Sequence, residues 1–125
     1  MRTLIQGEII NFVPTFKAYI REDLLAFDSD GDIFLTVDTG FDGEIMLPQI
    51  ILDDMNLEFM GYDTFTIATG ETIELPIFYG KVIVKKQEFE AWFIPGDQLV
   101  GMEFFCKVGK ALELNFEEST VNLIG

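Results

Sequence analysis

The sequence predicts one mainly β domain, a closed or nearly closed barrel of short antiparallel strands with one or two short helices. Apolar and polar residues alternate with period two along most of the chain, for example in residues 16–20 and 89–94, as in half-buried strands. Clusters of turn-forming residues separate these runs about every ten residues, a spacing typical of antiparallel β domains. The turn clusters are residues 28–32, 69–70, 85–87, 95–97 and 117–119.

The elements follow from these patterns in chain order. Strands are expected along residues 16–20, 33–37, 73–79, 89–94 and 112–116. Residues 48–55 predict a short helix because Pro48 stands at an early position, although Asp53 and Asp54 fall late and oppose the helix dipole. Residues 100–107 predict a second helix of one or two turns. Lys85 and Lys86 are expected to be a hairpin tip and not a binding patch.

Length and composition indicate one domain, residues 1–125, with its own apolar core, since 49% of the 125 residues are hydrophobic. No apolar run approaches the ~18 residues of a membrane span, and the N-terminus lacks the apolar segment of a signal peptide. The one cysteine, Cys106, lies in an apolar run and is expected in the core. We therefore expect a protein of the reducing cytoplasm.

Charge and the absence of histidine narrow the possible functions. Eight basic residues stand against 22 acidic ones, a net charge of −14, which argues against binding to nucleic acid or anionic membranes. No histidine is present, which excludes histidine-based nucleophile systems and histidine metal sites. Acid–base chemistry must then come from carboxylates, lysine or tyrosine, and no cofactor or metal is expected.

Asp38-Thr39-Gly40 is the most informative stretch. An apolar run, residues 33–37, leads into it, and residues 41–48 read Phe-Asp-Gly-Glu-Ile-Met-Leu-Pro. A carboxylate at the end of a buried strand is costly unless it has a partner, so a chemical role is one interpretation. The other is an ordinary strand-ending turn that Asp38 caps, and the tripeptide alone leaves both open.

Taken together, three motifs resemble the single-domain, retroviral-type aspartic peptidases of the pepsin superfamily, and in particular small prokaryotic members. Residues 37–48 carry the Asp-Thr-Gly-Phe-x-Gly pattern followed by apolar residues and Leu-Pro, the hairpin 65–73 stands where the family has its flap, and residues 99–105 place two apolar residues and a glycine before a closing helix. The likeness runs from about residue 7 to residue 123. It implies a small closed β-barrel of the retropepsin-like type.

The resemblance also implies the roles of the site residues. Asp38, Thr39 and Gly40 would be the catalytic triplet, and because the chain has one copy, Asp38 from each subunit of a homodimer would form the dyad. Thr39 would hydrogen-bond to the partner's loop, and Gly40 would allow close backbone approach. Val100 and Gly101 would support the loop from beneath.

Three further residues are candidates for substrate binding: Asp42, and Thr69 and Gly70 at the tip of the flap hairpin. Asp42 is a weaker candidate, since the following Gly43 departs from the pattern of viral relatives. Thr69 and Gly70 also suit a plain hairpin turn. Apolar residues that follow the triplet are expected in the core: Phe41, Ile45 and Met46.

Two kinds of function remain. The first is an aspartic endopeptidase that hydrolyses peptides bound in extended form, as an added strand beneath the flap. The second is a non-catalytic peptide-binding or dimerisation module that keeps the fold, for example in a regulatory system. The intact triplet at residues 38–40 favours the enzyme.

Overall fold

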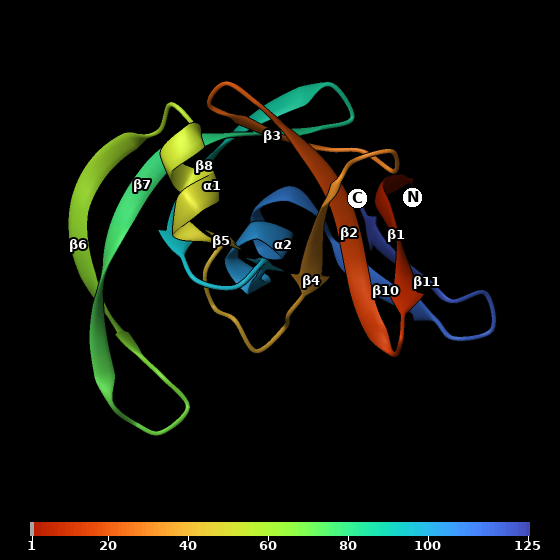
Figure 1. The fold of residues 1–125 in the computed structure, drawn as a ribbon. Helices are drawn as coiled ribbons and strands as arrows, with labels where there is room; N and C mark the ends of the chain where they lie inside the picture. The colour runs from red at the N-terminus through yellow and green to blue at the C-terminus, as the bar shows by residue number, and fades with distance from the viewer. Residues whose placement is uncertain (1) are drawn as a thin grey trace.

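The computed structural model describes residues 2–125, and within them it contains eleven strands and two short helices (Figure 1). The strands are β1 (Thr3–Ile10), β2 (Val13–Arg21), β3 (Leu24–Phe27), β4 (Ile33–Val37), β5 (Ile45–Leu47), β6 (Glu58–Thr66), β7 (Thr72–Val84), β8 (Gln87–Pro95), β9 (Leu99–Val100), β10 (Ala111–Asn115) and β11 (Thr120–Ile124). The helices are α1 (Gln49–Asp54) and α2 (Met102–Val108). The chain is mainly β, as the period-two pattern predicts.

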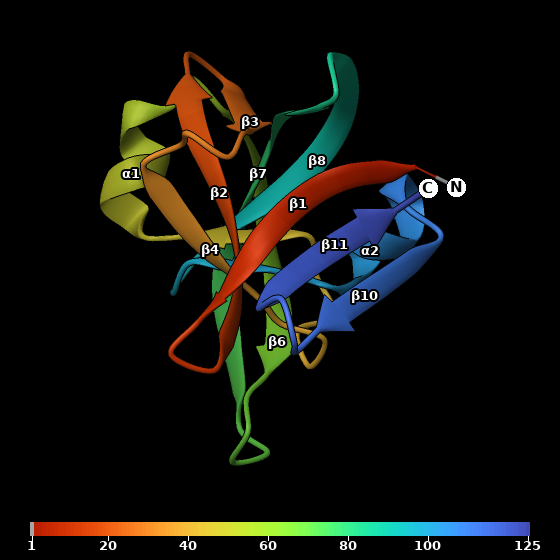
Figure 2. The same ribbon diagram turned by 90° about the vertical axis from the view of Figure 1, so that its right-hand side faces the viewer.

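The strand pairings close a ring in the order β2-β3-β7-β8-β5-β9-β4, because β4 pairs back onto β2. Strands β1, β11 and β10 continue from β2 as an arm on one side, and the β6–β7 hairpin extends on the other (Figures 1 and 2). The prediction of antiparallel strands alone is wrong at three places, where β3–β7, β4–β9 and β5–β8 are parallel. Strands far apart in sequence make these pairs, so alternation within a strand does not reveal them.

The ring is filled by apolar side chains that the sequence alternation directs inward. Phe16, Leu35 and Phe93 are fully buried, and Phe16 meets Phe105 edge-on at 6.5 Å between ring centroids. Fully burying one such side chain contributes about 1.5–3 kcal/mol. This packing fixes the position of β4, at whose end Asp38 stands.

Both predicted helices are present, shifted by one or two residues. Pro48 caps α1, and its carbonyl accepts the N–H of Leu52. Helix α2 buries Phe104 and Phe105, which turns the next side chain outward. The expectation that Cys106 lies in the core is therefore wrong, since its thiol is exposed.

The alternation on β10 does not correspond to burial. Leu112 is half-buried, but Leu114 and Phe116 are 43% and 78% exposed. Among the residues that the structure describes, β10 pairs with β11 alone and forms the outer edge of the β1-β11-β10 sheet, which leaves the end of its apolar face exposed.

Candidate functional site

Asp38 begins the loop that joins β4 to β5, and its own backbone turn shapes that loop. Its Oδ1 accepts the N–H of Gly40 at 2.9 Å, and its carbonyl accepts the N–H of Phe41 at 3.2 Å. Asp38 is half-buried, while Thr39 and Gly40 are exposed. This geometry fits both the turn interpretation and the catalytic one, because Asp38 caps the turn while Thr39 and Gly40 stay exposed.

Strand β9 and the start of α2 clamp this loop from beneath. The N–H of Asp38 donates to the carbonyl of Val100 at 3.0 Å, and the N–H of Gly101 donates to the carbonyl of Glu44 at 2.9 Å. The N–H of Met102 donates to the carbonyl of Phe41 at 2.8 Å. These bonds connect two segments about 60 residues apart, so the loop is held at both ends by backbone.

Gly101 makes this close approach possible. A Cβ at position 101 would lie 2.5 Å from the carbonyl oxygens of both Phe41 and Gly43, where ordinary contacts are 3.4 Å or more. Only glycine fits without displacing the loop. The structure therefore brings Asp38, Val100 and Gly101 together, as the resemblance implies for the site.

Glu44 holds the loop in place through a buried side chain, a role that no sequence pattern predicted. Its side chain is fully buried, and Oε2 accepts the backbone N–H of Trp92 at 3.1 Å. The ammonium of Lys107 meets Oε1 as an ion pair, without the angular geometry of a hydrogen bond, and donates instead to the carbonyl of Glu90 at 2.8 Å. Glu44 thus fastens the loop to β8 and α2 by side chain as well as backbone.

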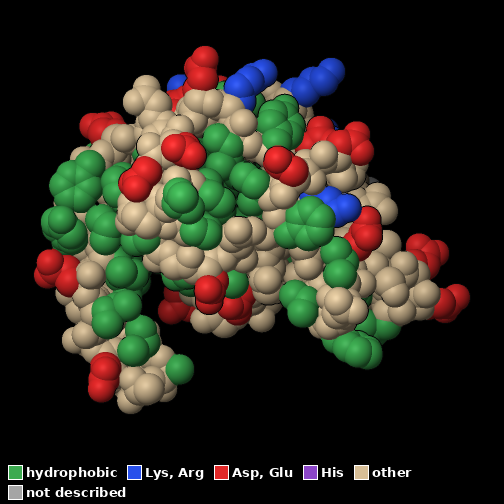
Figure 3. Space-filling model, viewed as in Figure 1, with side chains coloured by type: hydrophobic (Ala, Val, Ile, Leu, Met, Phe, Trp, Pro, Cys, Tyr) green, Lys and Arg blue, Asp and Glu red, His purple; other side chains and the backbone are tan. Residues whose placement is uncertain are grey.

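A groove of about 420 Å³ lies beside the loop, beneath the β6–β7 hairpin. Its lining is mostly apolar and aromatic: Phe41, Ile45, Met60, Tyr62, Phe65, Ile77, Trp92 and Ile94, with Gly43 and the acidic residues Glu44, Asp63 and Glu103. Figure 3 shows the hollow between the β6–β7 hairpin and the body, with hydrophobic side chains along the hairpin and acidic side chains on both. Phe41 and Ile45 thus serve both the core and the groove wall.

The other predicted substrate-binding residues lie outside the groove lining. Asp42 is exposed between Phe41 and Gly43, which do line it. Thr69 and Gly70 are exposed at the hairpin tip, where Gly70 has φ +87° and its N–H donates to the carbonyl of Ile67 at 2.9 Å. The hairpin arches away from the body in both ribbon views (Figures 1 and 2), so its tip does not contact the Asp38 loop.

The available acid–base groups point to carboxylates. A hydrogen bond with Glu90 raises the pKa of Tyr79 to about 12, and the ion pair with Glu88 raises the pKa of Lys81. Neither side chain is a base near neutral pH. The loop between β4 and β5 presents two carboxylates, the half-buried Asp38 and the exposed Asp42. Within residues 2–125 no group of three cysteine or acidic side chains is arranged to hold a metal ion.

Comparisons with protein-family models, curated proteins and solved structures gave no match. No helix among the described residues has the length and apolar character required to cross a membrane. The functional conclusion therefore rests on the geometry of the Asp38 loop and its groove.

Proposed function

We propose that this chain is an aspartic endopeptidase of the retropepsin-like type, active as a homodimer whose two copies of Asp38 form the catalytic dyad. The observation that carries the proposal is the clamped loop. Asp38 stands at the end of β4, which buries Leu35 and Val37 in the ring. Its N–H donates to the carbonyl of Val100, and the N–H groups of Gly101 and Met102 donate to carbonyls later in the same loop. A site that must hold a carboxylate within a fraction of an ångström requires such support.

The dimer follows from the number of carboxylates that the chemistry needs. Amide hydrolysis without metal or nucleophile uses two carboxylates that share one proton, because like charges ~3 Å apart cannot both ionise. The chain has one Asp-Thr-Gly triplet. Thr39 and Gly40 are exposed beside Asp38, so a second copy can approach the triplet across a two-fold axis.

In this reaction the ionised Asp38 takes a proton from water, and the resulting hydroxide attacks the peptide carbonyl carbon. The protonated Asp38 of the other copy gives its proton to the carbonyl oxygen, which forms a tetrahedral diol. Collapse of the diol returns one hydroxyl proton to the dyad while the leaving nitrogen is protonated, and the C–N bond breaks. The dyad ends with the one proton it began with.

The groove beneath the β6–β7 hairpin suits an extended substrate. Within residues 2–125, β6 pairs with β7 alone and is an edge strand, so a peptide can add to it by backbone bonds while its side chains enter the groove. Aromatic walls and the carboxylates of Glu44, Asp63 and Glu103 line the groove, and no basic residue does so within residues 2–125. We expect a preference for a side chain with an apolar stem and a cationic end.

A second candidate is a peptide-binding module without catalysis. The observation that favours it is that the groove lining does not include Asp38. A peptide can therefore occupy the groove whether or not the dyad forms. The intact triplet and its clamp favour the enzyme.

Cleavage of a diverse peptide library between pH 3 and 8 tests the proposal. The wild type and Asp30→Asn, which alters an exposed aspartate on a distant turn, should cleave the same peptides. Asp38→Asn should lose cleavage by at least the 10²–10⁴-fold that an acid–base group contributes, while its circular dichroism stays unchanged. Equal cleavage by Asp38→Asn would reject the enzyme. Peptide binding by all three proteins without any cleavage would support the module.

A further inference from the structure

A second cavity, of about 680 Å³, lies apart from the Asp38 loop and its groove. It opens where the sheet splits. Strand β1 pairs with β2 only through residues 8–10, and β3 pairs with the same strand beyond it through residues 24–27. Between them the N–H of Asp28 donates to the carbonyl of Lys17 at 3.0 Å, which makes the floor of a wedge between β1 and β3.

One wall of this cleft is an open strand edge. Within residues 2–125, residues 5–7 pair with β11 on one side and with no strand on the other, and the β1–β11 register shifts at Leu4. Gly7 sets the point of divergence, because a Cβ there would collide with the carbonyl oxygen of Thr15. Backbone groups along the open edge can accept a further strand. At ~3.3 Å per residue these three residues offer about 10 Å of edge.

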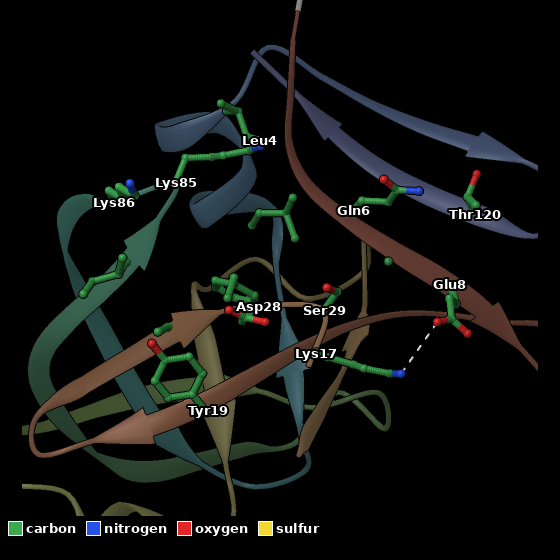
Figure 4. Close-up of a pocket in the computed structure, with 15 residues that line it drawn as sticks. Leu4, Gln6, Glu8, Lys17, Tyr19, Asp28, Ser29, Lys85, Lys86 and Thr120 are labelled. Atoms are coloured by element: carbon green, nitrogen blue, oxygen red, sulfur yellow. Dashed lines mark ion pairs between the residues drawn. The ribbon is translucent and has the colours of Figure 1, made fainter. Parts of the chain in front are cut away.

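The cleft lining carries a small excess of positive charge in a strongly acidic chain, and so does a smaller pocket lined by Arg2, Lys107 and Lys110. Lys17, Lys85 and Lys86 line the cleft, three of the eight basic residues, with only two of the 22 acidic residues, Glu8 and Asp28. Figure 4 shows Lys85 and Lys86 on one side and the Lys17–Glu8 ion pair, 3.6 Å long, at the other end. That ion pair neutralises Lys17, so Lys85 and Lys86 give the cleft a positive rim.

The turn that carries Lys85 and Lys86 has a backbone conformation that lysine disfavours. Lys85 and Lys86 join β7 to β8 with φ of +51° and +67°, the left-handed conformation for which such two-residue turns favour Asn-Gly. Side chains in this region cost on the order of 1 kcal/mol. Asn11 and Phe12 hold the same conformation at the β1–β2 turn, so the tight turn itself accounts for these φ values.

We propose that this cleft binds an extended, acidic peptide segment of a partner protein, which adds to the open edge of β1 and directs its carboxylates to Lys85 and Lys86. Strand addition supplies affinity through backbone bonds, and the rim supplies selection by charge. A small anion would use the lysines but not the edge. The site is independent of the proposed catalysis, because it shares no residue with the Asp38 loop.

The test uses the full chain carrying Asp38→Asn, so that no peptide is cleaved, and a fluorescent acetyl-Glu-Val-Glu-Val-Glu-Ser amide as the probe. Anisotropy at low salt should show saturable binding that weakens in 0.5 M NaCl, since salt screens the rim charges. Amide chemical shifts should move at residues 5–7, Lys85 and Lys86. A lysine-for-glutamate peptide should not bind, and neither should the acidic peptide with alternate amides N-methylated.

The decisive variant is Lys85→Asn with Lys86→Gly, which removes both charges and supplies the sequence that the turn favours. It should fold at least as stably as its parent and bind the probe about tenfold more weakly. The matched control, Arg21→Asn with Lys110→Asn, removes two exposed charges outside the cleft and should bind as before.

Besides the sedimentation result given below, four binding results would each overturn the proposal. They are equal weakening by the control pair, shift changes confined to the groove beneath β6–β7, undiminished binding of the N-methylated peptide, and displacement of the probe by millimolar phosphate with the same shifts, which indicates a small-anion site. Sedimentation decides on the occupant: a concentration-dependent dimer that Lys85→Asn with Lys86→Gly abolishes would show that a second copy fills the cleft, against the proposal.

Discussion

Replacing Gly101 by alanine should disable the Asp38 loop without touching the triplet. The new Cβ would lie roughly 0.9 Å inside ordinary contact distance with the carbonyl oxygens of Phe41 and Gly43. Overpacking of this kind costs about 1–3 kcal/mol. For 125 residues the entropy of unfolding is about 0.26 kcal/mol per degree, so the Tm should fall by about 4–11 °C. Displacement of the carboxylate by nearly 1 Å should lower kcat/KM about 100-fold.

Differential scanning calorimetry and peptide cleavage, measured on the same preparation, check both effects. Gly40→Ala is the control for stability, because a Cβ there meets only Oδ1 of Asp38, at 3.2 Å. Its Tm should stay within a few degrees of the wild type or rise, since alanine restricts the unfolded chain. A Gly101→Ala protein with unchanged Tm and unchanged cleavage would refute the reasoning that close packing against Gly101 holds the loop.

Three further outcomes are expected. Glu44→Ala should lower the free energy of unfolding by about 2–4 kcal/mol in urea titrations, because Lys107 and a backbone N–H lose their buried partner; a change within 0.5 kcal/mol would contradict the anchor. The hydrogen bond with Glu90 stabilises the neutral form of Tyr79 in the folded protein, so the stability that it contributes is complete below pH 10 and is lost as pH rises to about 12. Absorbance titration at 295 nm should show a late tyrosine ionisation that Glu90→Gln removes. A late ionisation that persists in the variant would count against the hydrogen bond. Trp92→Ala should weaken binding of an arginine-containing peptide about 10-fold or more by calorimetry, since truncating a large aromatic side chain in a groove removes much of its contact area; unchanged affinity would move the peptide elsewhere.

Local features of the fold follow from the sequence. Alternation places β4 at residues 33–37, Pro48 marks the start of α1, and the turn clusters at 69–70, 85–87 and 117–119 mark three hairpins. Each of these depends on residues close together in the chain, so propensity and period carry enough information. The turns of the β1–β2 and β2–β3 hairpins were not predicted. The proximity of Asp38 to Val100 does not follow from alternation, and the resemblance supplied it.

The remaining features depend on contacts between distant residues. Glu44 and Lys107 are 63 positions apart, and nothing in either neighbourhood indicates their ion pair. An acidic residue between Gly43 and Ile45, at the start of an apolar run, is the one signal that a buried carboxylate needed a partner. From the sequence alone, Lys85 and Lys86 are an ordinary hairpin tip. The cleft beside them arises because β1 diverges from β2, which the residues around the two lysines do not indicate.

The central claim is that Asp38 from each of two copies makes one active site, and a mixing experiment tests it most directly. Wild-type protein at fixed concentration is equilibrated with increasing Asp38→Asn protein, and cleavage of one library-selected peptide is followed. If two copies share the site, mixed dimers are inactive, so activity should fall to about half at an equal mixture and about a quarter at a threefold excess of the variant. Activity that stays constant at every ratio would show that each chain acts alone and would contradict the shared dyad.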